Sequence, residues 1–510
     1  MINFLGQQLR LQRWTRMLTI GLFLLLGLFI SLQAVFSSLT VLAAAVGMVL
    51  CVVAAVRPLW IISLLAVYLP FEPFILKFVS DEVYGYARFF SEGMIYVLCG
   101  VVCVQLMAGK IKRKPTVLDW PFLLFVGTLV CSAVINLVPP TIAILGIRQI
   151  IRFILVFFVI VHLSPSASYI KQLTIALLSV AIFQSGLGLL QSVIGAPLDA
   201  FLLPSETRAV GDITISGVSQ FWDPGSRVFA TLGRYDRLGS FLYVFLLLAV
   251  GFLYEMKPTI QRRSLYLVLG LGLPALLLTF SRASWFAFVL GFIYIGWVLR
   301  RDRRVLIGIG AFAIIMTGYL GLSGLNVRLL TETSGQTLAE RFYETFSYAR
   351  WRGEYYGLGR TFWFIETATH VVPAAPILGF GPGQYGGGAT AALRNTRVYD
   401  ELGLPFGVYG EEGTIDISWF SLWGEAGTLG LAFFLWMFVA LFRLALRTYR
   451  KSEQAFSRAL ASSFGALLIA VSFGAFLSTL LEIRTLAFYL WLYAGFLFVL
   501  SKKPKADHAV

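Results

Sequence analysis

Long apolar stretches follow one another along almost the whole chain, with short polar segments between them. A helix of roughly 17 to 25 apolar residues is long enough to cross the hydrocarbon core of a bilayer. The pattern therefore predicts an all-α polytopic membrane protein with about fourteen transmembrane helices, or twelve if the runs 58–79 and 148–163 do not fully cross. The predicted spans are 17–36, 38–56, 58–79, 91–108, 119–138, 148–163, 172–195, 238–256, 264–280, 284–299, 305–323, 417–441, 459–480 and 485–500.

Two polar segments, 196–237 and 324–416, are too long to be simple connections. They divide the chain into transmembrane regions at 1–195, 238–323 and 417–501, with a tail at 502–510. The second segment contains helix-compatible stretches, "QTLAERFYETFSYARW" and "RTFWFIETATHVV", and then the glycine-rich run "GFGPGQYGGG". It is expected to form a small helical cap over the membrane face. No internal repeat suggests the inverted halves of a transporter.

The distribution of basic residues predicts the orientation. If the N-terminus is cytoplasmic, the short loops on that side carry 24 of the 41 Lys and Arg residues but only five acids. Cytoplasmic loops of membrane proteins show this excess of positive charge. Both termini are therefore predicted to be cytoplasmic, and both long segments to lie on the opposite, periplasmic side.

Composition supports a membrane class and limits the chemistry. The chain is 58% hydrophobic and 13% charged, too apolar for a soluble domain. Its net charge of +15 is explained by topology and is no evidence for nucleic-acid binding. The four cysteines lie in predicted spans, and the three histidines have no metal-ligand spacing. No cofactor or metal site is predicted.

The bases on the predicted periplasmic side are almost all arginine. Sixteen of the seventeen are Arg, whereas the cytoplasmic side has nine Lys and fifteen Arg. A planar guanidinium binds phosphate or carboxylate through two parallel hydrogen bonds, so the preference indicates anion binding. Interface anchoring and salt bridges with the 21 acids on that side are the alternative explanation.

Position selects candidates among these arginines. Arg282 lies in a short turn, "TFSRASWF", where a charge is expected to face a polar cavity. Arg148 and Arg152 are four residues apart on one helix face and can reach an anion together, although interface anchoring also explains them. Arg227 and Arg234 share a loop with two aspartates, so ion pairing within the loop is an alternative for them.

Further candidates lie in the second long segment and after it. Arg360 begins an amphipathic stretch, and Tyr385 belongs to the glycine-rich run. Asp416 and Glu425 are the acids nearest the membrane in "TIDISWFSLWGEAGTLGL". Asp416 is expected to cap the following helix, a role compatible with accepting a proton from a sugar hydroxyl.

These residues resemble the O-antigen ligase and polymerase superfamily of bacterial envelope glycan assembly. The ligase signature is a His-Asn-type pair, nine residues and Gly-x-x-Gly; Asp416-Ile417 followed by Gly427-Thr428-Leu429-Gly430 has this spacing. The segments "RVFATLGRYDRLGSFL", "SRASW" and "GRTFWFIETATHVVPAAPILGFGPGQYG" are similar to three further family motifs. The resemblance covers roughly residues 225–435.

The resemblance implies a metal-independent inverting glycosyltransferase in the bacterial inner membrane, active at the periplasmic face. Arg282 and Arg360 would contact the diphosphate of a polyprenyl-linked glycan donor, and Asp416 would activate a glycan or lipid-linked acceptor. Arg227, Arg234, Arg148, Arg152, Glu425 and Tyr385 would line the substrate site. Asp replaces the ligase His at position 416, which favours a polymerase over a lipopolysaccharide ligase. Other envelope glycan assembly proteins are possible partners.

Two other classes fit parts of the pattern. A solute or anion transporter would also use many spans and an arginine cluster, but the long segments and the absence of a repeat argue against it. A noncatalytic scaffold of an envelope assembly complex would use the arginines structurally.

Overall fold

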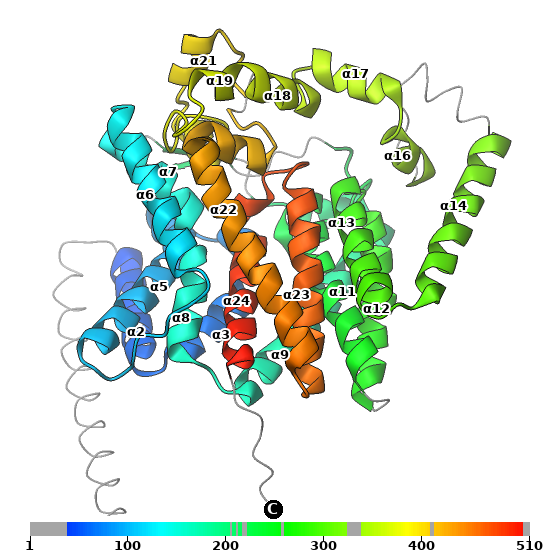
Figure 1. Cartoon of the computed structure of the whole chain (residues 1–510), viewed down its shortest axis with the longest axis horizontal. Helices are drawn as coiled ribbons and strands as arrows, with labels where there is room; N and C mark the ends of the chain where they lie inside the picture. Colours follow the sequence, from blue (N-terminus) through cyan, green and yellow to red (C-terminus); the bar gives the residue numbers. More distant parts are fainter. Residues whose placement is uncertain are drawn as a thin grey trace, which may run out of the picture.

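The computed structural model describes residues 38–204, 207–210, 213–216, 222–256, 260–323, 338–407 and 413–502. Most of the helices run roughly side by side and form a bundle, and residues 338–407 lie across one end of it (Figure 1). This segment is called the cap below. The last described residue, 502, lies at the opposite end of the bundle, at the end of the last helix (Figure 1).

Eight helices in the described part of the chain are long and apolar enough to cross a membrane. A ninth span is formed if the bent pair α7 and α8 counts as one. The chain is therefore a multi-pass membrane protein, as predicted, but helix length and composition do not reproduce the count of fourteen. The eight are α2 (Ser38–Val56), α5 (Asp81–Met107), α9 (Ala167–Ile194), α11 (Tyr235–Glu255), α13 with η2 (Arg282–Ile293 and Tyr294–Leu299), α22 (Ser418–Lys451), α23 (Ala455–Gly474) and α24 (Arg484–Ser501).

The other predicted spans form shorter or less packed helices. The run 119–138 gives α6 (Asp119–Ile135), and the run 264–280 gives α12 (Ile260–Leu278). The run 305–323 gives α14 (Arg303–Ser323), which stands apart from the bundle in Figure 1. The run 17–36 lies outside the described residues.

Two predicted spans are broken within the structure. The run 58–79 divides into α3 (Pro58–Tyr68) and α4 (Glu72–Leu76), with Pro70 between them and Pro73 in the first turn of α4. A proline cannot continue a helix from the preceding turn, which explains this break. The run 148–163 belongs to α7 (Pro140–Ile151) and α8 (Ile154–Leu163), which meet at an angle of 55° beside Arg152.

Helices α11, α23 and α24 form the centre of the bundle and bury most of their side chains. Small residues let them approach their neighbours closely, as is usual where lipid leaves little hydrophobic force between helices. A Cβ atom added at Gly251 of α11 would overlap the Ser463 hydroxyl of α23. One added at Gly495 of α24 would lie 2.7 Å from the Ile160 side chain of α8.

The cap is a set of short helices with its own small apolar core. Trp363, Tyr385 and Tyr399 are fully buried there and pack against one another. This agrees with the predicted helical character of the segment. The cap elements are α16 (Leu338–Glu344), α17 (Tyr348–Tyr356), α18 (Arg360–Glu366), η3 (Thr367–Val371), α19 (Val372–Ala374), α20 (Gly388–Ala392) and α21 (Arg397–Leu402).

The first long segment contains little regular structure. Its elements are α10 (Ala196–Leu202), a two-stranded antiparallel hairpin of β1 (Thr207–Val210) and β2 (Ile213–Ser216), and η1 (Ala230–Leu232). The other described elements are helical, so the expected all-α class is confirmed, with this one small hairpin added. Two glutamines of α9 bind the end of the segment: Gln191 accepts the backbone N–H groups of Phe229 and Ala230, and Gln184 donates to Thr231.

Helix α22 changes direction at Gly427, whose φ of 66° and ψ of −175° interrupt the helix. This region is accessible almost only to glycine. The break lets the cap chain approach, since the N–H of Thr428 donates to the carbonyl of Pro376 and that of Leu429 to Ile377. The nine residues before Gly427 therefore form a separate short helix under the cap.

Replacing Gly427 by alanine is expected to destabilise the protein by about 1–3 kcal/mol from backbone strain alone. An added Cβ would also overlap the Ile377 carbonyl oxygen. Thermal unfolding in detergent would measure the effect. The control is Gly270→Ala on the exposed face of α12, where nothing lies within 4 Å of an added Cβ. Equal melting temperatures for the two variants would contradict the strained turn.

Candidate functional site

A buried glutamate gathers three arginines at the junction between the cap and the bundle. Glu344, the last residue of α16, lies 3.3 Å from Arg282, 2.9 Å from Arg341 and 3.5 Å from Arg350. Arg282 is the first residue of α13 and pairs with Glu344, whereas the polar cavity expected there stays a prediction. The Glu344 carboxylate is therefore shared by three guanidinium groups.

Arg360 and Asp416 form a second ion pair next to this cluster. The Arg360 guanidinium donates to the Asp416 carboxylate at 3.1 Å, and both side chains remain about one third exposed. Arg360 begins α18, as the amphipathic pattern predicted. Arg360 is also close enough to Arg282 for the two charges to interact. The pair therefore joins the Glu344 cluster to Asp416, which lies just before α22.

Asp416 does not cap α22, and that prediction is wrong. The helix begins at Ser418, its N-cap residue is Ile417, and no side chain there accepts a capping hydrogen bond. Asp416 has a left-handed backbone with φ of 56°. This conformation turns the carboxylate toward Arg360 and away from the α22 amide groups, so it stays available to a polar ligand.

Arg227 and Arg234 complete the group from the first long segment. The Arg227 guanidinium stacks on the Tyr235 ring at 4.4 Å, and burial lowers its pKa, with Arg341 adding to the effect and Glu344 opposing it. Arg234 lies 3.0 Å from Asp236, so the expected pairing within this loop occurs. Asp236 raises the pKa of Arg234, and Asp416 contributes in the same direction.

These residues are called the arginine site below. It contains six arginines and two carboxylates from the first long segment, α13, the cap and the residue pair before α22. Guanidinium groups held in this way bind phosphate oxygens through charge-assisted hydrogen bonds. The members are Arg227, Arg234, Arg282, Arg341, Arg350, Arg360, Glu344 and Asp416.

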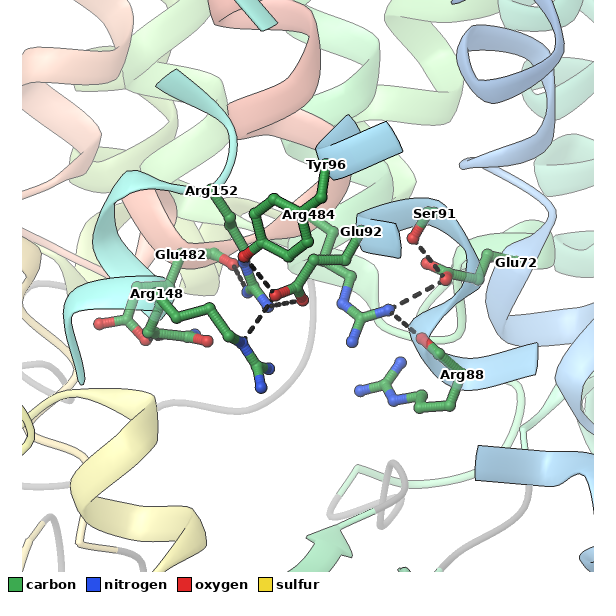
Figure 2. A network of polar contacts seen from close by, with 10 residues as sticks. Glu72, Arg88, Ser91, Glu92, Tyr96, Arg148, Arg152, Glu482 and Arg484 are labelled. Atoms are coloured by element: carbon green, nitrogen blue, oxygen red, sulfur yellow. Dashed lines mark hydrogen bonds and ion pairs between the residues drawn. The ribbon is translucent and has the colours of Figure 1, made fainter. Parts of the chain in front are cut away.

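Arg148 and Arg152 belong to a different cluster, which Figure 2 shows. Both bind the buried Glu92 of α5: Arg148 lies 2.6 Å from one carboxylate oxygen and Arg152 lies 3.0 Å from the other. Tyr96 donates to the same carboxylate at 2.9 Å. The two arginines do reach an anion together, as their spacing predicted, but in the structure that anion is a side chain of the protein.

A second glutamate, Glu72 of α4, lies in the same view (Figure 2). It accepts hydrogen bonds from Ser91 and from Arg484, the first residue of α24, both at 3.0 Å. Arg484 also donates to the backbone carbonyl of Arg88 at 2.7 Å. The partners Glu72 and Arg484 are 412 residues apart in the chain, so this cluster ties its beginning to its end.

Two residues predicted to bind substrate have structural roles. Glu425 is 3% exposed and accepts the backbone N–H of Gly383 at 3.0 Å, so it holds the glycine-rich run against α22. Tyr385 is fully buried and exchanges a hydrogen bond with Thr367 inside the cap. Burial raises the pKa of Tyr385, which keeps its hydroxyl neutral. Glu425 also lines a cavity between α22 and α24 together with Ser421 and Glu482, so its role in binding substrate stays a prediction, as does that of Tyr385.

The glycine-rich run at 379–388 packs closely against the backbone of α7 and α22. Gly379, Gly381, Gly383 and Gly386 all have positive φ. A Cβ atom at Gly146 of α7 would overlap the Gly383 amide nitrogen. These glycines therefore let the run pack closely against α7 and α22.

Sequence reasoning did not single out Glu344, Arg341 and Arg350, or the carboxylates Glu72 and Glu92. A usable signal existed for the last two, because they lie in or beside apolar runs, where an ionisable side chain requires a partner. Glu344 had no such signal, since it lies outside the apolar runs and its partner Arg282 comes from a distant helix.

Among the described residues, no three His, Cys, Asp or Glu side chains are grouped as metal ligands would be. Comparison of the chain with known protein families and with curated proteins found no match.

Proposed function

We propose that the chain is a membrane glycosyltransferase that transfers glycan from a polyprenyl-diphosphate donor to a glycan or lipid-linked acceptor. The observation that supports this most strongly is the arginine site, where Asp416, about one third exposed, pairs with Arg360, which in turn interacts with Arg282. The proposal also rests on the resemblance of residues 225–435 to the O-antigen ligase and polymerase superfamily. The transfer needs anion binding and a base, and this site supplies groups for both.

The proposed reaction inverts the anomeric carbon in one displacement. The acceptor hydroxyl oxygen attacks the anomeric carbon, a new glycosidic bond forms, and the bond from that carbon to the donor phosphate oxygen breaks. Negative charge develops on the departing diphosphate, where Arg282 and Arg360 would stabilise it without a metal ion. Asp416 would accept the proton of the attacking hydroxyl.

The cap is proposed to face the periplasm. Many basic residues lie at the end of the bundle opposite the cap, where α14 begins at Arg303 and α22 ends at Lys451 (Figure 1). Such a charge excess marks the cytoplasmic side in multi-pass proteins. The donor would then be bound in the outer leaflet of the bacterial inner membrane.

Polymerisation is favoured over ligation to a lipid acceptor. The ligase signature places His where this chain has Asp416, and the following position is the apolar Ile417, fully buried. A carboxylate can serve as the base for a sugar hydroxyl in either reaction. The two reactions differ in the acceptor, which is a glycan in polymerisation and a lipid in ligation.

Transfer in proteoliposomes tests the proposal. Purified protein with a lipid-linked oligosaccharide is expected to yield longer glycans, and a protein with Arg282, Arg360 and Asp416 all changed to alanine should yield none. Arg352→Gln on the exposed face of α17 is the matched control and should be fully active. An unchanged product ladder from the triple variant would refute the enzyme assignment. Movement of substrate across the membrane without a product would favour transport.

A further inference from the structure

The arginines around Glu72 carry more positive charge than this carboxylate neutralises, and Figure 2 shows two of them, Arg88 and Arg484. Arg88, Arg237 and Arg484 interact electrostatically with one another and with Glu72, which is already paired with Arg484. The nearest further carboxylate, Asp236, is paired with Arg234. Counting that pair as neutral, three guanidinium groups share one carboxylate, which leaves a local charge of about +2.

Two of these guanidinium groups are not used in holding the fold. Within the described residues, neither Arg88 nor Arg237 has a side-chain hydrogen bond or an ion pair. Both side chains are partly buried. Retaining like charges at partly desolvated positions is costly unless an anion compensates them.

The three side chains converge from different elements. Arg88 is on α5, Arg237 is in the first turn of α11, and Arg484 begins α24. In Figure 2 the guanidinium groups of Arg88, Arg148 and Arg484 extend away from the bundle helices and toward the middle of the view. Arg148, which is not one of the three, is held by Glu92. Arg484 is held in place by its ion pair with Glu72. Arg484 is thus preorganised, which reduces the entropy that this donor loses when a ligand binds.

We infer that Arg88, Arg237 and Arg484 form a second anion site, distinct from the arginine site, which binds one phosphate group. Three fork-shaped donors fit a phosphate dianion, whose three oxygens accept several charge-assisted hydrogen bonds. The phosphate belongs either to a lipid headgroup or to a free anion, because both present the same chemistry.

Binding of inorganic phosphate tests the site. The measurement uses the full chain in nanodiscs of neutral phosphatidylcholine, with Arg282→Gln and Arg360→Gln present so that phosphate binding at the arginine site is weakened equally in every variant compared. Phosphate is expected to bind this protein at constant ionic strength. Adding Arg88→Gln and Arg237→Gln should weaken binding at least about tenfold, whereas adding Arg352→Gln should leave it unchanged. Equal affinity with and without Arg88 and Arg237 would overturn the site.

A second arm separates the two sources of phosphate. The wild type and the Arg88→Gln/Arg237→Gln variant are incorporated in nanodiscs containing phosphatidic acid, and lipid retained after detergent extraction is counted by native mass spectrometry. Retention by the wild type and loss in the variant identifies a lipid headgroup. Phosphate binding without lipid retention identifies a free anion, and the absence of both contradicts the inference. No glycan transfer enters either arm, so the result is independent of the proposed function.

Folding is checked separately in each variant. Arg88 and Arg237 have no ion-pair partner among the described residues, so their replacement should not lower the melting temperature. Arg237→Gln alone serves as a second variant, and it should weaken phosphate binding less than the double change does. Weaker binding together with an unchanged melting temperature is the expected result.

Discussion

An Asp416→Asn variant is expected to lose glycosyl transfer by about 10²–10⁴-fold, the usual contribution of a positioned general base. The amide has nearly the same shape but cannot take the proton of the acceptor hydroxyl. Asparagine tolerates the left-handed backbone at this position, where φ is 56°. The ion pair with Arg360 is about one third exposed on both sides, so its loss should cost little stability.

Initial rates with a lipid-linked oligosaccharide would measure this effect, together with donor affinity, which should change little. The matched control is Asp400→Asn, since Asp400 is an exposed carboxylate of α21 in the same cap that binds Thr396. A rate for Asp416→Asn within a few-fold of the control would remove Asp416 from the chemistry and leave it as a partner of Arg360.

Replacing Arg282 by glutamine is expected to reduce the transfer rate by about 10²–10³-fold, as the loss of one transition-state hydrogen-bond donor does in other enzymes. The charge that develops on the departing diphosphate would lose one of its donors. Folding should be kept, because Glu344 retains Arg341 at 2.9 Å and Arg350 at 3.5 Å after Arg282 is removed.

Arg282→Lys separates charge from geometry in the same assay. Lysine keeps the positive charge but not the planar fork, so partial recovery of the rate is expected. The exposed Arg352→Gln serves again as control. If Arg282→Gln melts at the wild-type temperature and transfers at the wild-type rate, Arg282 acts only as a salt-bridge partner of Glu344.

Local patterns in the sequence predicted much of the fold. The apolar run 38–56 coincides with α2, and the run 485–500 falls within α24, because burial in lipid requires a continuous apolar helix. The positions where helices break inside apolar runs were harder to predict from the sequence. The bend beside Arg152 depends on the long-range contact of its guanidinium with Glu92, which the local sequence does not encode.

The candidate site was predicted in part, for a related reason. Arg282 could be selected because a charge in a short turn between two spans needs a polar environment, and Arg360 because it begins an amphipathic stretch; the two interact in the structure. Glu425 carries the same kind of signal, yet it binds the Gly383 amide inside the protein. Sequence position indicates that a buried charge has a partner, but whether the partner is substrate or backbone depends on tertiary packing.

The central claim is most directly tested by the stoichiometry of the reaction in proteoliposomes. Glycosidic bonds formed and free polyprenyl diphosphate released would be counted in the same sample of wild-type protein. The account predicts one polyprenyl diphosphate released for each bond formed, with both products absent in Asp416→Asn at equal times. Lipid-linked substrate that crosses the membrane with its diphosphate bond intact, and no new glycosidic bond, would contradict it.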